Sequence, residues 1–235
     1  MEVKNKKTYY QIILDNSGSM YDCVESTVNG FNKQMQMIKS LESKFPDQEV
    51  LVSLTTFNQH VSFQIECSKP HDLKEMISER NYSEKLDFLI EENLNKKFVV
   101  YSPNGMTSLY DAIGSSIENI QNVAKKEIEE DIATIVVVII TDGHENSSKI
   151  FTYSQIQSMI KELEKSDNWT FSYLSNTPDA VDYATKMNIK QENSFRYNKD
   201  DMYGAHSGLA FSMDSYMDKK SKNIKDQQFY KFKRK

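Results

Sequence analysis

Short apolar runs alternate with amphipathic stretches along most of the chain. Residues 10–14 are apolar, rich in β-forming side chains and followed by a polar cluster, which predicts a strand. Between residues 24 and 45 the apolar positions recur every three or four residues, which predicts an amphipathic helix that Pro46 ends. Strand-like and helix-like segments continue to alternate further along the chain. This alternation favours one α/β sheet with helices on both faces.

A hairpin is expected after this first helix. Residues 50–57 form a strand-like run, and apolar residues alternate with polar ones over residues 60–65. Because only Asn58 and Gln59 separate the two runs, they should pair antiparallel, with the second run as an edge strand.

The clearest strand of the sequence is residues 132–140. An unbroken β-branched run of this kind needs burial on both faces, and this predicts a central parallel strand. The remaining pattern predicts helices over residues 108–130, 153–165, 178–187 and 200–220 and a strand over residues 169–174. Two segments are less regular: a short helix is expected near residues 73–77, and helical spacing over residues 86–94 precedes a short extended piece at 98–101.

Composition narrows the class of protein. The 235 residues are 38% apolar and 27% charged with a net charge of -5, which fits a folded globular chain. No apolar run approaches the roughly 20 residues that a membrane-spanning helix needs, and the first residues have no signal-peptide pattern. Only Cys23 and Cys67 are present, so we expect a reduced, cytoplasmic protein with no disulfide framework.

The charge is unevenly distributed. Residues 217–235 contain eight Lys or Arg and two Asp, a net +6, which leaves 21 basic and 32 acidic residues, a net -11, in residues 1–216. An acidic body does not fit a nucleic-acid-binding domain. The basic end, with Phe229, Tyr230 and Phe232, could contact an acidic partner or nucleic acid, but a frayed or back-docked segment fits it better.

Three polar clusters follow predicted strands or begin a predicted helix. They are Asp15-x-Ser17-x-Ser19, the segment around Thr107, and Asp142 directly after the central strand. In an open parallel sheet, ligands bind beyond the carboxyl ends of the strands, so these side chains should converge. They supply two carboxylates and three hydroxyls, and ligation by oxygen alone favours Mg²⁺ or Mn²⁺.

Simpler roles compete with metal ligation. Asp15, Ser17 and Ser19 could cap a helix, and Thr107 could cap the next one while still ligating a metal. Asp111, one turn into that helix, fits a structural role better than ligation. A lone His144 beside Asp142 is weak evidence for catalysis. Cys23, at the start of the first predicted helix, is interpreted as a small side chain packed in the core.

These segments resemble the von Willebrand factor A (vWA) domain and its metal-ion-dependent adhesion site. The resemblance rests on Ile-Ile-Leu-Asp15-Asn-Ser17-Gly-Ser19, Gly105-Met-Thr107-Ser-Leu-Tyr-Asp111 and Ile-Ile-Thr-Asp142-Gly. It extends to Asn29-Gly30-Phe31-Asn32 and to residues 173–180, which are similar to segments of small stand-alone vWA proteins of bacteria and phages.

The resemblance implies a Rossmann-like α/β/α domain over residues 1–220, followed by a basic tail, residues 221–235. It implies that Ser17, Ser19 and Thr107 ligate Mg²⁺ or Mn²⁺ by hydroxyl, and that Asp15 and Asp142 act directly or through water. The implied function is non-catalytic binding of a protein that presents an Asp or Glu carboxylate to the metal, with no membrane involved.

Two other functions remain open at this point. A metal-dependent hydrolase or phosphotransfer enzyme could use the same site, but it would need a base or nucleophile that the motifs do not supply. A nucleic-acid-associated protein could act through the basic tail, in which case binding would depend on salt.

Overall fold

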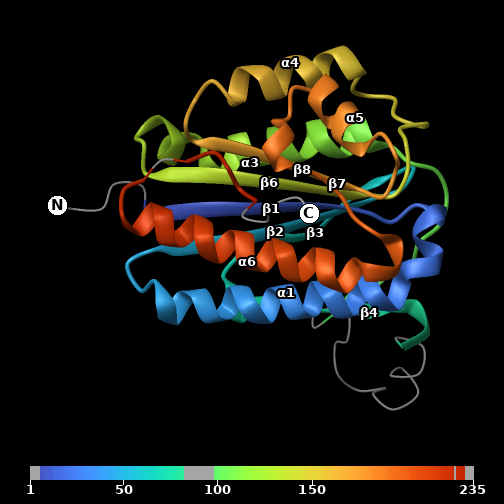
Figure 1. The fold of residues 1–235 in the computed structure, drawn as a ribbon, viewed down its shortest axis with the longest axis horizontal. Helices are drawn as coiled ribbons and strands as arrows, with labels where there is room; N and C mark the ends of the chain where they lie inside the picture. The colour runs from blue at the N-terminus through green and yellow to red at the C-terminus, as the bar shows by residue number, and fades with distance from the viewer. Residues whose placement is uncertain (1–5, 82–97, 225, 231–235) are drawn as a thin grey trace.

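The computed structural model describes residues 6–81, 98–224 and 226–230. A six-stranded sheet with the order β3-β2-β1-β6-β7-β8 forms its centre (Figure 1). Its strands are β1 (Lys7–Asp15), β2 (Glu49–Phe57), β3 (Val61–Ser68), β6 (Ala133–Thr141), β7 (Trp169–Ser175) and β8 (Ser194–Arg196). All neighbours pair parallel except β2 and β3, which form the predicted antiparallel hairpin at one edge.

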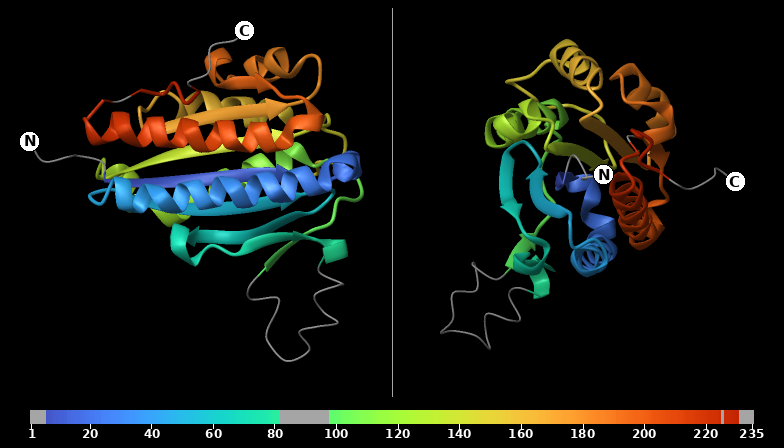
Figure 2. Two further views of the ribbon diagram at one scale, coloured as in Figure 1. Left: turned by 60° about the horizontal axis from the view of Figure 1, so that its bottom comes forward. Right: turned by 90° about the vertical axis from the view of Figure 1, so that its left-hand side faces the viewer.

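Helices cover both faces of the sheet. On one face α1 (Val24–Lys44) packs beside α6 (Met202–Ser221), and on the other lie α3 (Leu109–Glu129), α4 (Tyr153–Leu163) and α5 (Ala180–Lys186) (Figures 1 and 2). The predicted three-layer α/β/α fold with a mostly parallel sheet is therefore confirmed.

Strand β6 has the central position that its sequence predicts. All nine of its residues are buried, and it pairs with β1 on one side and β7 on the other. Val136 and Val138 point into the core beneath α1 and α6, while Val137 and Ile139 point into the core beneath α3. A strand that faces two cores has no polar face, and this explains its unbroken apolar run.

The prediction of a short helix near residues 73–77 is wrong. Residues Pro70–Asp72 form a single 3-10 turn, η2, and the chain then extends as β4 (Glu75–Ser78), which pairs parallel with β5 (Phe98–Tyr101). The side chain of Asn32 on α1 holds this strand: its Oδ1 accepts from the Met76 N–H and its Nδ2 donates to the Met76 carbonyl, both at 2.8 Å. Contacts distant in sequence thus override the local pattern. The helical spacing over residues 86–94 lies outside the described residues.

The segment after α6 returns to the body of the protein. Asn193 Nδ2 donates to the Gln227 carbonyl, and the Phe229 N–H donates to Asn193 Oδ1, both at 2.7 Å. Phe229 and Tyr230 are buried against the core beneath α1 and α6. These two aromatic side chains are therefore not available on the surface to stack on nucleic acid.

None of the helices in the described ranges combines the length and the apolar character that crossing a membrane requires.

Candidate metal site

The carboxyl ends of β1 and β6 bring the two predicted carboxylates to one edge of the sheet. Leu14 on β1 pairs with Ile140 on β6, so Asp15 and Asp142 follow at neighbouring positions. Asp15 is fully buried, and its carboxylate accepts hydrogen bonds from Thr141 Oγ1 at 2.6 Å and from the Ser17 N–H at 2.7 Å. These bonds fix the orientation of Asp15 at the base of the site.

The two predicted serines lie directly beside these carboxylates. Ser17 Oγ is 3.1 Å from Ser19 Oγ, and Ser19 Oγ in turn donates a short hydrogen bond to Asp142 Oδ1. Ser17 is buried whereas Ser19 is exposed, so the cluster opens to solvent on the Ser19 side. The structure thus brings together four of the five predicted residues.

Thr107 reaches the cluster from a different loop. The Gly18 N–H donates to the Gly105 carbonyl at 3.1 Å, which joins the Thr107 loop to the serine loop. Gly105 has a φ of +74°, a backbone conformation that favours glycine. A Cβ atom placed on Gly143 would lie 3.5 Å from Thr107 Oγ1 and 3.6 Å from Ser19 Oγ. Gly143 therefore lies close to both hydroxyls, and a side chain at this position would contact each of them.

The donor set fits a small, hard cation. Adjacent oxygens around octahedral Mg²⁺ are expected about 3.0 Å apart when each metal–oxygen distance is about 2.1 Å, and the two serine oxygens are 3.1 Å apart. Burial, together with the nearby Asp142 charge, raises the pKa of Asp15 to about 6. A bound divalent cation would stabilise the charged form of this carboxylate. No cluster of three His, Cys, Asp or Glu side chains suited to a metal occurs in the described ranges.

Two tyrosines that the sequence pattern did not reveal hold the strand ends in place. Tyr101 donates its hydroxyl proton to the Asp15 carbonyl at 2.7 Å, and Tyr197 donates to the Thr141 carbonyl at 3.2 Å. Both tyrosines are buried and come from β5 and from the segment after β8. They fix the backbone that carries Asp15 and Asp142 through its carbonyl groups.

Lys199 is the most prominent residue that sequence reasoning missed. It begins the 3-10 turn η5 (Lys199–Asp201) before α6, and its Nζ lies 2.8 Å from Asp142 Oδ2. The same ammonium group donates to the Ser19 carbonyl. No local motif marks Lys199, because it reaches the site only when α6 packs across the sheet.

Asp111 is structural, as its position one turn into the helix predicts. Its carboxylate accepts the N–H groups of Lys149, Ile150 and Phe151 at 2.8, 2.9 and 2.8 Å, which fixes the loop after β6 onto the start of α3. The capping alternative receives no support at the serine cluster: Ser17 precedes η1 (Gly18–Cys23) and makes no side-chain cap bond. Ser108, and not Thr107, is the N-cap residue of α3.

His144 lies outside the cluster of ligands. Its side chain is 55% exposed, its Nε2 is 3.6 Å from Asp179 Oδ1, and its ring packs edge-on against Tyr183. These contacts direct the imidazole toward α5 and its preceding turn.

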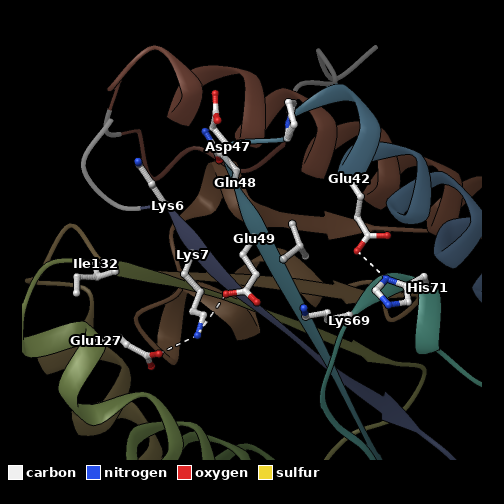
Figure 3. A pocket seen from close by; sticks show the side chains of 12 residues that line it. Lys6, Lys7, Glu42, Asp47, Gln48, Glu49, Lys69, His71, Glu127 and Ile132 are labelled. Atoms are coloured by element: carbon white, nitrogen blue, oxygen red, sulfur yellow. Dashed lines mark hydrogen bonds and ion pairs between the residues drawn. The ribbon is translucent and has the colours of Figure 1, made fainter. Parts of the chain in front are cut away.

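A second hollow of about 670 Å³ lies at the opposite end of the sheet (Figure 3). Its charges pair with one another: Lys7 Nζ is 2.8 Å from Glu127 Oε1 and 3.4 Å from Glu49 Oε2, and His71 Nδ1 is 3.1 Å from Glu42 Oε1. Each of these three carboxylates thus pairs with a Lys or His side chain, whereas the strand-end cluster combines two carboxylates with serine hydroxyls.

Solved structures with a similar fold include vWA proteins. One is the proximal thread matrix protein 1 of the mussel byssus, whose metal-ion-dependent adhesion site (MIDAS) motif is occupied by zinc. It is 16% identical, with a TM-score of 0.52 over 91% of this chain and 47% of that one. A von Willebrand factor type A protein from Catenulispora acidiphila is 11% identical, with a TM-score of 0.51 over 91% and 42%. The PilB minor pilin from Streptococcus sanguinis is 13% identical, with a TM-score of 0.50 over 91% and 62%.

This chain spans less than two thirds of the length of each of these three proteins. Comparison with curated protein sequences gives no significant match. The sequence model of the von Willebrand factor type A domain matches residues 11–207, which include all five predicted ligands. On this match and on the fold, the chain belongs to the von Willebrand factor type A domain family.

Proposed function

We propose that this protein is a divalent-metal-dependent protein-binding module. Mg²⁺, or Mn²⁺, would be held by Asp15, Ser17, Ser19, Thr107 and Asp142, and a partner protein would supply an Asp or Glu carboxylate to the metal. The observation that carries this proposal is the convergence of Asp15, Ser17, Ser19 and Asp142 at the ends of two central strands.

The composition of the site favours capture of a carboxylate. Two protein carboxylates and three neutral hydroxyls leave a divalent cation with few negative ligands. Such an ion attracts a further charged oxygen, and a partner's carboxylate can replace a bound water. The exposed Ser19 side marks the direction from which that carboxylate would approach.

The surface beside the site supports a protein as the partner. Tyr21 is 73% exposed and Met106 is 54% exposed, and they neighbour Ser19 and Thr107 in the sequence. Exposed aromatic and methionine side chains are common at protein interfaces, where they become buried around polar anchors. An acidic side chain flanked by apolar residues would fit this surface.

A hydrolase or phosphotransfer role has weaker support. Such chemistry needs a base or nucleophile poised over the metal. His144 faces Asp179 and Tyr183, and Ser17 Oγ is bonded to Ser19 within the ligand cluster.

The zinc-occupied MIDAS motif of the byssus protein supports a divalent metal, and zinc therefore belongs in the binding test beside magnesium and manganese.

Calorimetry tests the metal site. Wild type should bind one Mg²⁺ or Mn²⁺, and Asp15→Ala should lose that binding because the best-oriented carboxylate is removed. Asp72→Ala is the matched control, since its carboxylate is exposed on η2 and outside the cluster. Uptake of metal by Asp15→Ala equal to that of wild type would show that the ligands are assigned wrongly.

Thr107 tests the capture of a partner. Thr107→Ala should lose a partner that wild type retains from cell lysate with Mg²⁺ and releases with EDTA, whereas Thr107→Ser, which keeps the hydroxyl, should retain it. The free energy of unfolding of Thr107→Ala should differ from that of wild type by no more than about 1 kcal/mol, since a single neutral hydroxyl is lost. Equal recovery with wild type, EDTA and Thr107→Ala would place the interaction on another surface.

A further inference from the structure

Lys199 places a positive charge directly on a predicted metal ligand. We propose that Lys199 is a resident counter-ion, whose ammonium group neutralises Asp142 in the metal-free protein and is displaced when a divalent cation binds. The inference rests on the proposed metal-binding function, and it adds a residue that sets the affinity of the site for metal.

The burial of Asp142 explains the need for a counter-ion. Its side chain is 1% exposed, and an unpaired carboxylate at that depth would be strongly destabilised. Oδ1 accepts from Ser19, and Oδ2 is 2.8 Å from Lys199 Nζ. Lys199 therefore supplies the charge that a metal would otherwise supply.

The position of the ammonium group makes it a competitor of the metal. It bonds to Asp142 and to the Ser19 carbonyl, so it contacts two of the residues that supply the ligand set. A third, weaker contact joins it to Asp22 at 4.0 Å. A divalent cation on Asp142 would face this positive charge across a few ångströms in a partly buried site, where repulsion is strong. Displacement of the lysine relieves that repulsion.

Displacement would also release an attachment of α6. Lys199 begins η5, and Asp201 of the same turn accepts the Gly204 N–H at 2.9 Å and so caps α6. In the metal-free protein the ion pair with Asp142 ties this turn to the end of β6. Loss of the ion pair leaves the turn held by its local hydrogen bonds, such as the one from the Asp200 N–H to Asn198 Oδ1 at 3.1 Å, and by the upstream bond from the Tyr197 hydroxyl to the Thr141 carbonyl.

Substitution of Lys199 by methionine tests the proposal, because methionine keeps most of the length of the side chain without its charge. Calorimetry with Mg²⁺ alone should show that Lys199→Met binds about tenfold more tightly than wild type, the effect of removing one partly buried ion pair. Lys222→Met is the matched control: it makes the same change in net charge at the far end of α6, where Lys222 pairs with Asp218. Its affinity should equal that of wild type.

Two further measurements, one without metal and one on adding it, complete the test. In EDTA, Lys199→Met should melt below both wild type and Lys222→Met, because Asp142 is left buried without a counter-ion. Amide hydrogen exchange over residues 199–204 should accelerate when Mg²⁺ is added to wild type, and it should already be fast in Lys199→Met.

The outcomes separate this proposal from the one on which it rests. If wild type binds Mg²⁺ and Lys199→Met binds it equally or more weakly, the lysine does not compete and the counter-ion proposal is wrong, while the metal site stands. If neither protein binds any of Mg²⁺, Mn²⁺ or Zn²⁺, the proposed function fails and displacement by metal fails with it. In that case a lower melting temperature of Lys199→Met in EDTA would show only that the ion pair stabilises the fold.

Discussion

The imidazole of His206 on α6 fills the space above Gly30 on α1. A Cβ atom placed on Gly30 would lie 2.8 Å from His206 Cδ2 and 3.1 Å from its Cβ, closer than atoms of a well-packed core approach. His206 is fully buried, and its Nδ1 is 2.7 Å from Gln34 Oε1, while Gln34 Nε2 donates to the Tyr10 hydroxyl at 2.8 Å. Gly30 therefore permits the close packing of the two helices that cover one face of the sheet.

Gly30→Ala should destabilise the protein by about 1–3 kcal/mol because the added methyl group overlaps the ring of His206. This loss should appear even though alanine favours a helix over glycine by about 1 kcal/mol. Urea unfolding measures the change in the free energy of unfolding.

The double variant Gly30→Ala with His206→Ala supplies the control. With the ring absent, only the contact with the Cβ atom of residue 206 at 3.1 Å remains, so the cost of Gly30→Ala should fall in that background. The same cost in both backgrounds would mean that His206 is not what Gly30 accommodates.

Asp111→Asn should loosen the loop after β6 without abolishing the fold. An amide keeps one acceptor oxygen, whereas the carboxylate accepts three backbone N–H groups with two oxygens. We expect a loss of about 1–3 kcal/mol and faster hydrogen exchange at residues 149–151. Glu118→Gln, a change on α3 outside this loop, should have little effect. Unchanged exchange in Asp111→Asn would contradict the anchoring role.

Phe229→Ala should destabilise the protein by about 2 kcal/mol, less than the 3–5 typical of a central core phenylalanine, because a terminal segment can undock separately. The Phe229 ring packs 6.2 Å from the rings of both Tyr10 and Tyr216, measured between centroids. Phe211→Ala is the control, since this side chain is 54% exposed on α6. Equal melting temperatures of the two variants would show that docking of residues 226–230 contributes nothing.

Lys220 should make stability rise with pH above neutrality. It is buried at the end of α6, where its Nζ donates to the Lys7 carbonyl at 2.5 Å, to Thr8 Oγ1 at 2.6 Å and to Thr134 Oγ1 at 2.8 Å. Burial lowers the pKa of Lys220 to about 7, from 10.5 in the unfolded chain. Between these values the unfolded state binds more protons than the native state, so the free energy of unfolding increases with pH.

Urea unfolding of wild type and Lys220→Met at pH 7 and pH 9 checks this sign. Wild type should gain more stability over the interval than the variant, since other groups titrate equally in both. Parallel pH dependences would mean that Lys220 stays protonated in the folded protein, held by its three oxygen partners.

The parts of the fold that depend on local pattern could be predicted from the sequence. The spacing of Val28, Phe31, Met35 and Ile38 gives α1, and the β-branched run gives β6, because each pattern records which faces are buried. Strand β4 could not be predicted from its own sequence. Its four residues are held in an extended conformation by Asn32 of α1 and by pairing with β5, and both partners are distant in the sequence. The short strand β8 likewise exists only through its pairing with β7.

The residues of the candidate site also fall into two groups, those that the sequence reveals and those that it does not. Asp15, Ser17 and Ser19 belong to one loop, so their spacing reveals them, and Asp142 directly follows the clearest strand. Lys199 and Tyr197 could not be found, because their contacts with Asp142 and Thr141 form only when the segment between β8 and α6 folds over the strand ends. The structure also explains the Asn29 to Asn32 motif, in which Gly30 makes room for His206 and Asn32 binds β4.

Helix α6 is attached to the sheet by a lysine side chain near each end. Lys199 bonds at the carboxyl end of β6, and Lys220 bonds at the amino ends of β1 and β6. A slide of one helical turn, about 5.4 Å, exceeds the reach of a hydrogen bond, so both attachments together permit a single axial register. If metal displaces Lys199, the packing of His206 against Gly30 and its contact with Gln34 still hold the helix further along. The freedom gained would then be confined to the first turn of α6, beside the metal site.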